Sequence, residues 1–255
     1  MSHPSLFKII IGFALLFAGY HAAEYMVLYQ NSTAGFLALQ LVFFLLALLI
    51  AKTQGYKGLS AWGMTVNRST LLYLSAGLLA GIVLDAIAYI TCLYMGIETI
   101  SHIPSTSDFI QQSALLIFGT FFSSLSEDVL TRGYIYRHIN SNKYPVLFVL
   151  LSSGIYVLNH IHRLNEPIYL LYLLLIGIQL AIPLFFTKNI WYTLGCHWAG
   201  NIVYHITNTV MHTDSDNSGR DMWVFMVFVA LLIPVNYIVS KRLGPEKSSK
   251  IPALA

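Results

Sequence analysis

The sequence has few charged side chains: Asp, Glu, Lys and Arg together make up 10% of its 255 residues. Soluble domains carry roughly 25% charged residues, so this composition is not that of a soluble protein. The hydrophobic fraction is 56%, and several stretches of about 20 residues, the length of a membrane-crossing helix, are almost free of charge. The composition therefore predicts an all-α, polytopic membrane helical bundle.

Cysteine is equally scarce. The two cysteines, Cys92 and Cys196, both fall inside hydrophobic stretches, so neither a disulfide framework nor a cysteine-rich metal site is supported. The sequence also shows no repeat, no low-complexity segment and no linker long enough to divide domains. We expect a single integral membrane domain over residues 1–255.

Eight hydrophobic stretches predict eight transmembrane helices. With both termini on one side of the membrane, 12 of the 14 Lys and Arg residues lie on that side, and only Arg163 and Arg220 lie on the other. This segregation favours two cytoplasmic termini, because basic residues concentrate in cytoplasmic loops. The basic residues are explained by topology, so we expect no nucleic-acid partner. The expected spans are 6–23, 33–51, 70–95, 109–130 (running on to 139), 145–161, 168–186, 189–207 and 222–240.

Four charged residues, Glu127, Asp128, Arg132 and Arg137, lie in "SSLSEDVLTRGYIYR", toward the end of the fourth stretch. An ionised side chain at the centre of a membrane helix costs about 2.5–3.5 kcal/mol, so it normally faces the bundle interior or a water-filled cavity. Asp128 and Arg132 are four residues apart and can neutralise each other. Glu127 has no partner at that spacing, which leaves its carboxylate available as a general base. A solvated helix end explains the same charges equally well.

A second polar group lies in "SSGIYVLNHIHR". Tyr156 and His160 are four residues apart, so we expect the phenol ring to pack beside the imidazole. A lone histidine late in an apolar helix is more often a hydrogen-bonded packing residue than a catalyst. The neighbouring Asn159 and His162 weaken that interpretation without removing it.

The third group lies in "WYTLGCHWAGNIVYHITN". His197, Asn201 and His205 recur every four residues along one helix face, where they can hold helices together by hydrogen bonds. They can equally direct two N–H donors at a developing oxyanion. Together the three stretches supply a carboxylate, two histidines and an amide, a set that suits the activation of water against a carbonyl.

These three motifs resemble the CPBP family of intramembrane proteases, which includes CAAX prenyl endopeptidases and bacteriocin-processing or self-immunity membrane proteins. The family pattern is matched in order by "EDVLTR" followed by Gly133, by "YVLNH" and by "HWAGN", within a core of about 109–208. Two positions depart from it. Asp128 stands where Glu is common, and Tyr156 stands where Phe is usual.

The resemblance implies a role for each matched residue. Glu127 and His160 are implied to activate the attacking water, and His197 and Asn201 to stabilise the tetrahedral oxyanion. Asp128, Arg132 and Tyr156 are implied to support this catalytic group. The implied reaction is peptide-bond hydrolysis of a prenylated CAAX-type or membrane-inserted substrate, without a cofactor and without a covalent acyl-enzyme.

Other functions stay open. Glu127, His160 and His197 could instead form a two-histidine, one-carboxylate zinc site. The chain could be a non-catalytic scaffold or a bacteriocin self-immunity protein that keeps the fold. A transporter would use Asp85, or His21 with Glu24, as a proton path, whereas a hydrogen-bonded interhelical contact explains Asp85 more simply.

The expected site lies within a membrane. Its partners are the lipid bilayer and a peptide or lipidated protein substrate, in a bacterial or archaeal cell membrane. Counted along their spans, Glu127, His197 and His160 lie about 18, 13 and 24 Å from the cytoplasmic helix ends. Tilted helices or shifted boundaries must therefore bring the three residues level.

Overall fold

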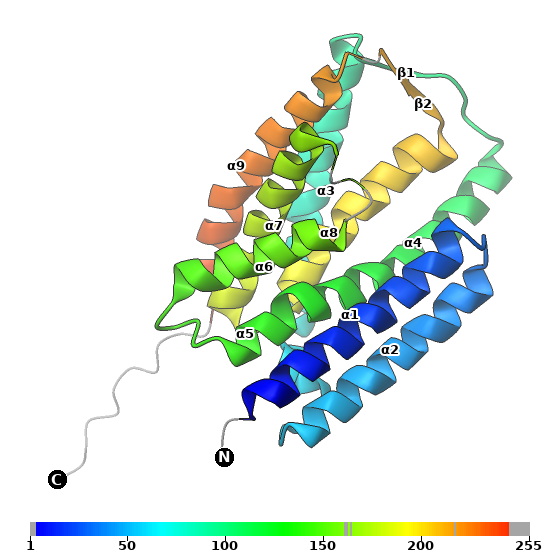
Figure 1. Cartoon of the computed structure of the whole chain (residues 1–255). Helices are drawn as coiled ribbons and strands as arrows, with labels where there is room; N and C mark the ends of the chain where they lie inside the picture. Colours follow the sequence, from blue (N-terminus) through cyan, green and yellow to red (C-terminus); the bar gives the residue numbers. More distant parts are fainter. Residues whose placement is uncertain (1–3, 161–162, 164, 217, 245–255) are drawn as a thin grey trace.

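The computed structural model describes residues 4–160, 163, 165–216 and 218–244, which form a helical bundle (Figure 1). Its long helices follow the hydrophobic stretches, and their boundaries agree with the predicted ones to within a few residues. They are α1 (Leu6–Leu28), α2 (Thr33–Thr53), α3 (Thr70–Tyr94), α4 (Thr106–Asp128), α6 (Pro145–Asn159), α7 (Pro167–Thr187), α8 (Trp191–His205) and α9 (Arg220–Leu243).

Short elements modify this pattern. A 3₁₀-helix, η1 (Leu59–Trp62), lies between α2 and α3. A π-helical turn, η2 (Val129–Gly133), and α5 (Tyr134–His138) continue α4, and a second π-helical turn, η4 (Ile206–Val210), continues α8. Two three-residue strands pair antiparallel, β1 (Glu98–Ile100) with β2 (Thr213–Ser215).

The described part of the chain contains six helices that are long and apolar enough to cross a membrane. They are α1, α2, α3, the continuous helix Thr106–His138, α7 and α9. α6 and α8 each have 15 residues. Such a helix is about 22 Å long, shorter than the ~30 Å hydrocarbon core. The chain is thus an integral, multi-pass membrane protein, and the count of eight crossings stays a prediction.

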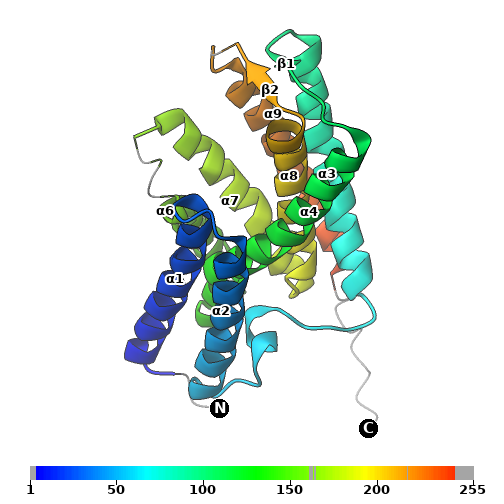
Figure 2. The same cartoon turned by 90° about the vertical axis from the view of Figure 1, so that its right-hand side faces the viewer.

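The helices are arranged around α4. α1 and α2 form an antiparallel hairpin on one side of it, and α3, α7, α8 and α9 gather on the other (Figures 1 and 2). α3 and α8 pack most closely. Gly77 of α3 lies against the backbone of α8, and Gly195 of α8 lies against the backbone of α3, at positions where a Cβ atom would collide. α6 differs from the rest, since it runs obliquely across the bundle (Figure 1).

The basic residues gather at one end of the bundle, here called the basic end. α1 begins and α9 ends there, as does α2 (Figures 1 and 2). Contacts join these termini: Gln54 Nε2 donates to the Lys8 carbonyl at 3.0 Å, and Tyr73 Oη donates to the Leu243 carbonyl at 2.9 Å. The described basic residues of this end are Lys8, Lys52, Lys57, Arg68, Arg137, Lys143, Lys188, Lys241 and Arg242.

Arg163 and Arg220 lie toward the opposite end, where α7 and α9 begin. Charge therefore segregates along the bundle as the sequence predicts. Which end faces the cytoplasm stays a prediction. His162, Lys247 and Lys250 lie outside the described residues.

Candidate active site

The two acids of the first motif lie at a change of helix type. α4 ends at Asp128, and the π-helical turn begins with the next residue, Val129. Such turns occur frequently at functional sites. Gly133 closes the turn where a Cβ atom would collide with the Trp62 carbonyl oxygen. Only glycine therefore lets this helix approach η1 so closely.

Asp128 and Arg132 form a completely buried ion pair, as their spacing predicts. Both side chains have 0% exposure, and Arg132 Nη1 donates to Asp128 Oδ1. The same Nη1 donates to Thr131 Oγ1 at 2.9 Å. The guanidinium carbon lies 4.7 Å from the centre of the Tyr156 ring, a cation–π contact. These contacts fix the Asp128 carboxylate from one side.

His197 of α8 lies between the two acids. Its Nδ1 is 3.0 Å from Asp128 Oδ1, and its Nε2 is 3.4 Å from Glu127 Oε2. Because Asp128 is held by Arg132 as an acceptor, Nδ1 carries the proton that it donates to Asp128. Nε2 is thereby turned toward Glu127, which is 4% exposed. The imidazole is oriented in the way a carboxylate orients a reactive histidine.

Asn159, the last residue of α6, completes the group around Glu127. Its Nδ2 donates to Glu127 Oε1 at 3.2 Å. The sequence marks Asn159 only as a polar neighbour of His160, because no helical spacing relates residues 32 positions apart. α4, α6 and α8 therefore each contribute a polar side chain to one buried cluster.

His160 caps α6 immediately after Asn159. Its ring centre lies 5.1 Å from that of Tyr156, so the expected packing of phenol against imidazole is confirmed. His160 Nδ1 is 3.0 Å from the Tyr156 carbonyl oxygen, which leaves Nε2 on the far side of the ring. The centre of the Tyr156 ring also lies 6.0 Å from that of His197, so this phenol packs near both imidazoles.

The sequence places His160 at a different depth from Glu127, and the course of α6 bears on that difference. The 24 Å spacing assumed a helix perpendicular to the membrane, whereas α6 runs obliquely across the bundle (Figure 1). Asn159, next to His160, therefore reaches Glu127 although α6 begins near the basic end.

Asn201 also faces α4, one helical turn from His197. Its Nδ2 donates to Ser124 Oγ at 2.9 Å, and Ser124 is four residues before Asp128. The shared face of His197 and Asn201 agrees with their spacing. His205 lies farther along α8, with Nδ1 3.2 Å from Thr209 Oγ1. The structure thus brings His197 and Asn201 to α4 and leaves His205 to a local contact.

Several buried polar atoms of the cluster have unused hydrogen-bonding capacity. Asp128 Oδ2, Arg132 Nε and Nη2, and Asn159 Oδ1 have no hydrogen-bond partner among the described residues. Buried groups of this kind ordinarily bind water. The cluster is therefore suited to holding water beside a carboxylate.

The zinc alternative does not fit this arrangement. Within residues 4–160, 163, 165–216 and 218–244, no three His, Cys, Asp or Glu side chains are grouped so that they could hold a metal ion. Both ring nitrogens of His197 already face carboxylate oxygens of Asp128 and Glu127.

The other polar groups named from the sequence lie on different elements. Asp85 of α3 faces α8, with Oδ2 3.4 Å from the position of a Cβ atom on Gly200. On α1, Glu24 accepts from Tyr20 Oη at 2.9 Å and lies 3.0 Å from His21 Nδ1. Tyr20 packs in the same apolar cluster as Leu125, so this second polar group lies along the α1 face of α4.

Residues 109–203 match the family described as type II CAAX prenyl endopeptidase Rce1-like. This stretch is therefore similar to the Rce1-like proteases. It runs from α4 into α8 and holds every residue of the buried cluster, which confirms the resemblance to the CPBP intramembrane proteases. The family supports a protease of the CAAX endopeptidase kind. No curated protein and no solved structure matches the chain.

Proposed function

We propose that the chain hydrolyses a peptide bond of a prenylated CAAX-type or membrane-inserted substrate, using water activated by Glu127 and His160. The observation that carries this proposal is the buried contact of Glu127 with His197 and Asn159 inside the Rce1-like region. Glu127 Oε1 accepts from Asn159, whereas Oε2 lies 3.4 Å from His197 Nε2, too far for a strong hydrogen bond, and so can take part in proton transfer. That geometry is suited to a general base.

In this mechanism Glu127 removes a proton as the water oxygen attacks the scissile carbonyl carbon. The carbonyl electron pair moves onto oxygen and forms the tetrahedral oxyanion. When the intermediate collapses, the C–N bond breaks and the proton held by Glu127 passes to the leaving amine. His160, fixed through its Nδ1 by the Tyr156 carbonyl, assists at the water. Because water is the nucleophile, no acyl-enzyme forms.

His197 is the proposed oxyanion donor. Its Nε2 edge lies 3.4 Å from Glu127 Oε2, so the imidazole is beside the position where the activated water attacks and the oxyanion develops. Asn201 is proposed as the second donor, and it must exchange its bond to Ser124 for one to the substrate.

The first experiment measures cleavage, in detergent and in liposomes, of a farnesylated C-a-a-X peptide and of several single-span membrane peptides. Glu127→Gln, His160→Ala and His197→Ala are each expected to lower kcat by at least about 10²-fold, the contribution typical of a positioned acid–base group. Asp85→Asn is the matched control, because it neutralises another intramembrane carboxylate outside the cluster. It is expected to keep full activity.

The same assay separates the competing functions. Cleavage that survives Glu127→Gln contradicts the assignment of the base. A folded wild-type protein that cleaves no member of the panel supports the scaffold or immunity alternative instead. Lasting inactivation by a chelator that zinc restores would show a metal-dependent reaction. The member of the panel that is cleaved identifies the substrate class.

A further inference from the structure

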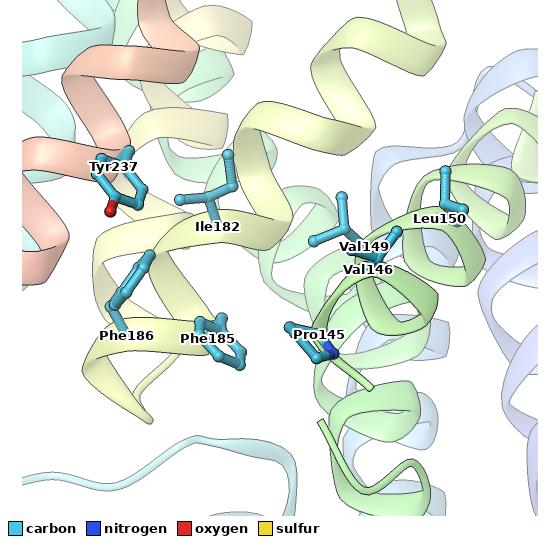
Figure 3. Close-up of a pocket in the computed structure, with 8 residues that line it drawn as sticks. All are labelled: Pro145, Val146, Val149, Leu150, Ile182, Phe185, Phe186 and Tyr237. Carbon is cyan, nitrogen blue, oxygen red and sulfur yellow. The ribbon is translucent and has the colours of Figure 1, made fainter. Parts of the chain in front are cut away.

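An apolar groove opens between α6, α7 and α9, away from the polar cluster. Its volume is about 280 Å³, and Figure 3 shows the hollow with its lining side chains. Apart from one phenol hydroxyl, the lining side chains are hydrocarbon. They include Val146, Val149, Ile182, Phe185, Phe186 and Tyr237.

The groove lies at the basic end. Its α6 residues belong to the first two turns of that helix, and its α7 residues belong to the last two turns. Tyr237 lies two turns before the end of α9. The groove therefore begins at the depth where lipid headgroups meet acyl chains.

Three lysines border the groove, each held by an aromatic ring of its wall or rim. Lys241 Nζ donates to Tyr237 Oη at 3.2 Å. Lys188 Nζ lies 4.6 Å from the centre of the Phe185 ring. Lys143 Nζ lies 5.0 Å from the centre of the Tyr144 ring, next to Pro145 of the groove. Their ammonium groups thus lie beside aromatic side chains in or next to the wall of the groove.

These three lysines form no ion pair with a carboxylate of the described residues. At the opposite end, in contrast, Arg163 pairs with Glu166 and Arg220 pairs with Asp216. Among the described residues, no carboxylate compensates the positive charge at the mouth of the groove. An anionic group is the complementary ligand.

The groove is separated from the proposed catalytic cluster. Ten residues of α6, about 15 Å of helix, separate Val149 from Asn159. The groove and the cluster are therefore separate sites near the two ends of α6.

We propose that the groove binds an anionic phospholipid, with one acyl chain between α6, α7 and α9 and the phosphate between Lys143, Lys188 and Lys241. Basic pockets between membrane helices bind anionic headgroups in this way, since each lysine near the headgroup adds attraction. The inference does not depend on the proposed hydrolysis.

The test is native mass spectrometry of the purified full-length protein, titrated with dioleoyl phosphatidylglycerol or with dioleoyl phosphatidylcholine. Wild type is expected to bind the anionic lipid at least about tenfold more tightly than the zwitterionic one. The combined variant Lys143→Gln, Lys188→Gln, Lys241→Gln is expected to lose this preference. The matched control Lys8→Gln, Lys52→Gln, Lys57→Gln removes the same charge from the same end and is expected to keep it.

A further variant tests the acyl-chain part of the site. Leu150→Trp fills the groove from its exposed rim without changing charge, and it is expected to weaken phosphatidylglycerol binding. Equal loss of preference in the two lysine variants would overturn the proposal, because the whole basic end would then attract the lipid. Displacement of the lipid by a farnesylated peptide would also overturn it and would assign the groove to the substrate.

Discussion

Arg132 is among the largest fully buried side chains of the molecule. Its guanidinium is compensated by Asp128 and by the face of the Tyr156 ring, while Asp128 also orients His197. Among the described residues, Arg132 pairs with Asp128 and not with Glu127. It therefore supports the candidate site by holding a neighbouring acid, a role distinct from that of Glu127.

Removing one member of the Asp128–Arg132 pair leaves a buried charge without its partner. We expect Arg132→Met to lower the free energy of unfolding by about 3–5 kcal/mol, and the double variant Asp128→Asn, Arg132→Met to lower it much less. Thermal unfolding of both variants in one detergent measures the difference. If the double variant unfolds at a lower temperature than Arg132→Met, the loss of stability in the single variant does not come from an unpaired Asp128 charge.

Glu98 is a second buried carboxylate, at the end of the bundle opposite the basic end. It is 7% exposed, and its Oε2 has no hydrogen-bond partner among the described residues. Burial, with a further contribution from the charge of Asp221, raises the pKa of Glu98 from 4.5 to about 7. The folded protein thus holds this proton more tightly than the unfolded chain does.

This difference gives stability a definite pH dependence. Unfolding releases the Glu98 proton between pH 4.5 and about 7, so stability falls as pH rises through that window. We expect Glu98→Gln to raise the unfolding temperature at pH 8 and to have little effect near pH 4.5, as measured by thermal scans. Asp216→Asn is the contrasting control, because hydrogen bonds from Ser218 and Arg220 lower the pKa of Asp216 to about 2. If both variants raise the unfolding temperature at pH 8, the cause is the loss of one negative charge from the protein and not the burial of Glu98.

Among the helices, the α3–α8 contact depends on missing side chains. A Cβ atom on Gly195 would collide with the Leu74 carbonyl oxygen, and one on Gly77 with the Tyr192 carbonyl oxygen. α8 carries His197, so this close approach also fixes how far the imidazole reaches toward α4. Packing and site geometry are therefore linked through one helix pair.

We expect Gly195→Ala to destabilise the protein by about 1–3 kcal/mol, the usual range for overpacking. Gly119→Ala is the matched control, because that helical glycine has no atom within 4 Å of its Cβ position. Its substitution is expected to be neutral or to stabilise by up to about 1 kcal/mol, through helix propensity. Thermal unfolding in detergent compares the two, and equal effects would contradict the close α3–α8 approach.

The sequence predicts the long helices well because hydrophobic length is a local signal. The α3 span was expected at 70–95 and is found at Thr70–Tyr94. The π-helical turn at Val129–Gly133 leaves no such signal, since it changes hydrogen-bond register and not composition. The β1–β2 pair was missed for a related reason: its strands have three residues each and join positions more than a hundred residues apart.

At the candidate site, the contacts within one helix were predictable and those between helices were not. The Asp128–Arg132 pair and the Tyr156–His160 packing follow from four-residue spacing. The placement of His197 between Glu127 and Asp128, and the contact of Asn159 with Glu127, depend on how three helices cross. Hydropathy along the sequence does not report how these helices cross.

For the whole molecule, the segregation of charge predicts its orientation. We expect Ser218→Cys to react in intact cells with a membrane-impermeant maleimide, and Asn142→Cys to react only after permeabilisation. The native Cys92 and Cys196 are buried and give little background. The reverse labelling pattern would place the basic end outside and contradict the two cytoplasmic termini.

The β1–β2 pair has a mechanical consequence for the bundle. It fastens the loop that leads into α4 to the loop that leaves α8, reinforced by the bond from Ser101 Oγ to the His212 carbonyl. The β1–β2 pair therefore links α4, which carries Glu127, to α8, which carries His197, at the end of the bundle opposite the basic end. α6 is no part of this joint and packs chiefly on α7. Among the described helices that contribute to the cluster, α6 is the one that the β1–β2 pair does not join to the others, so we expect a peptide that separates Glu127 from Asn159 to displace α6.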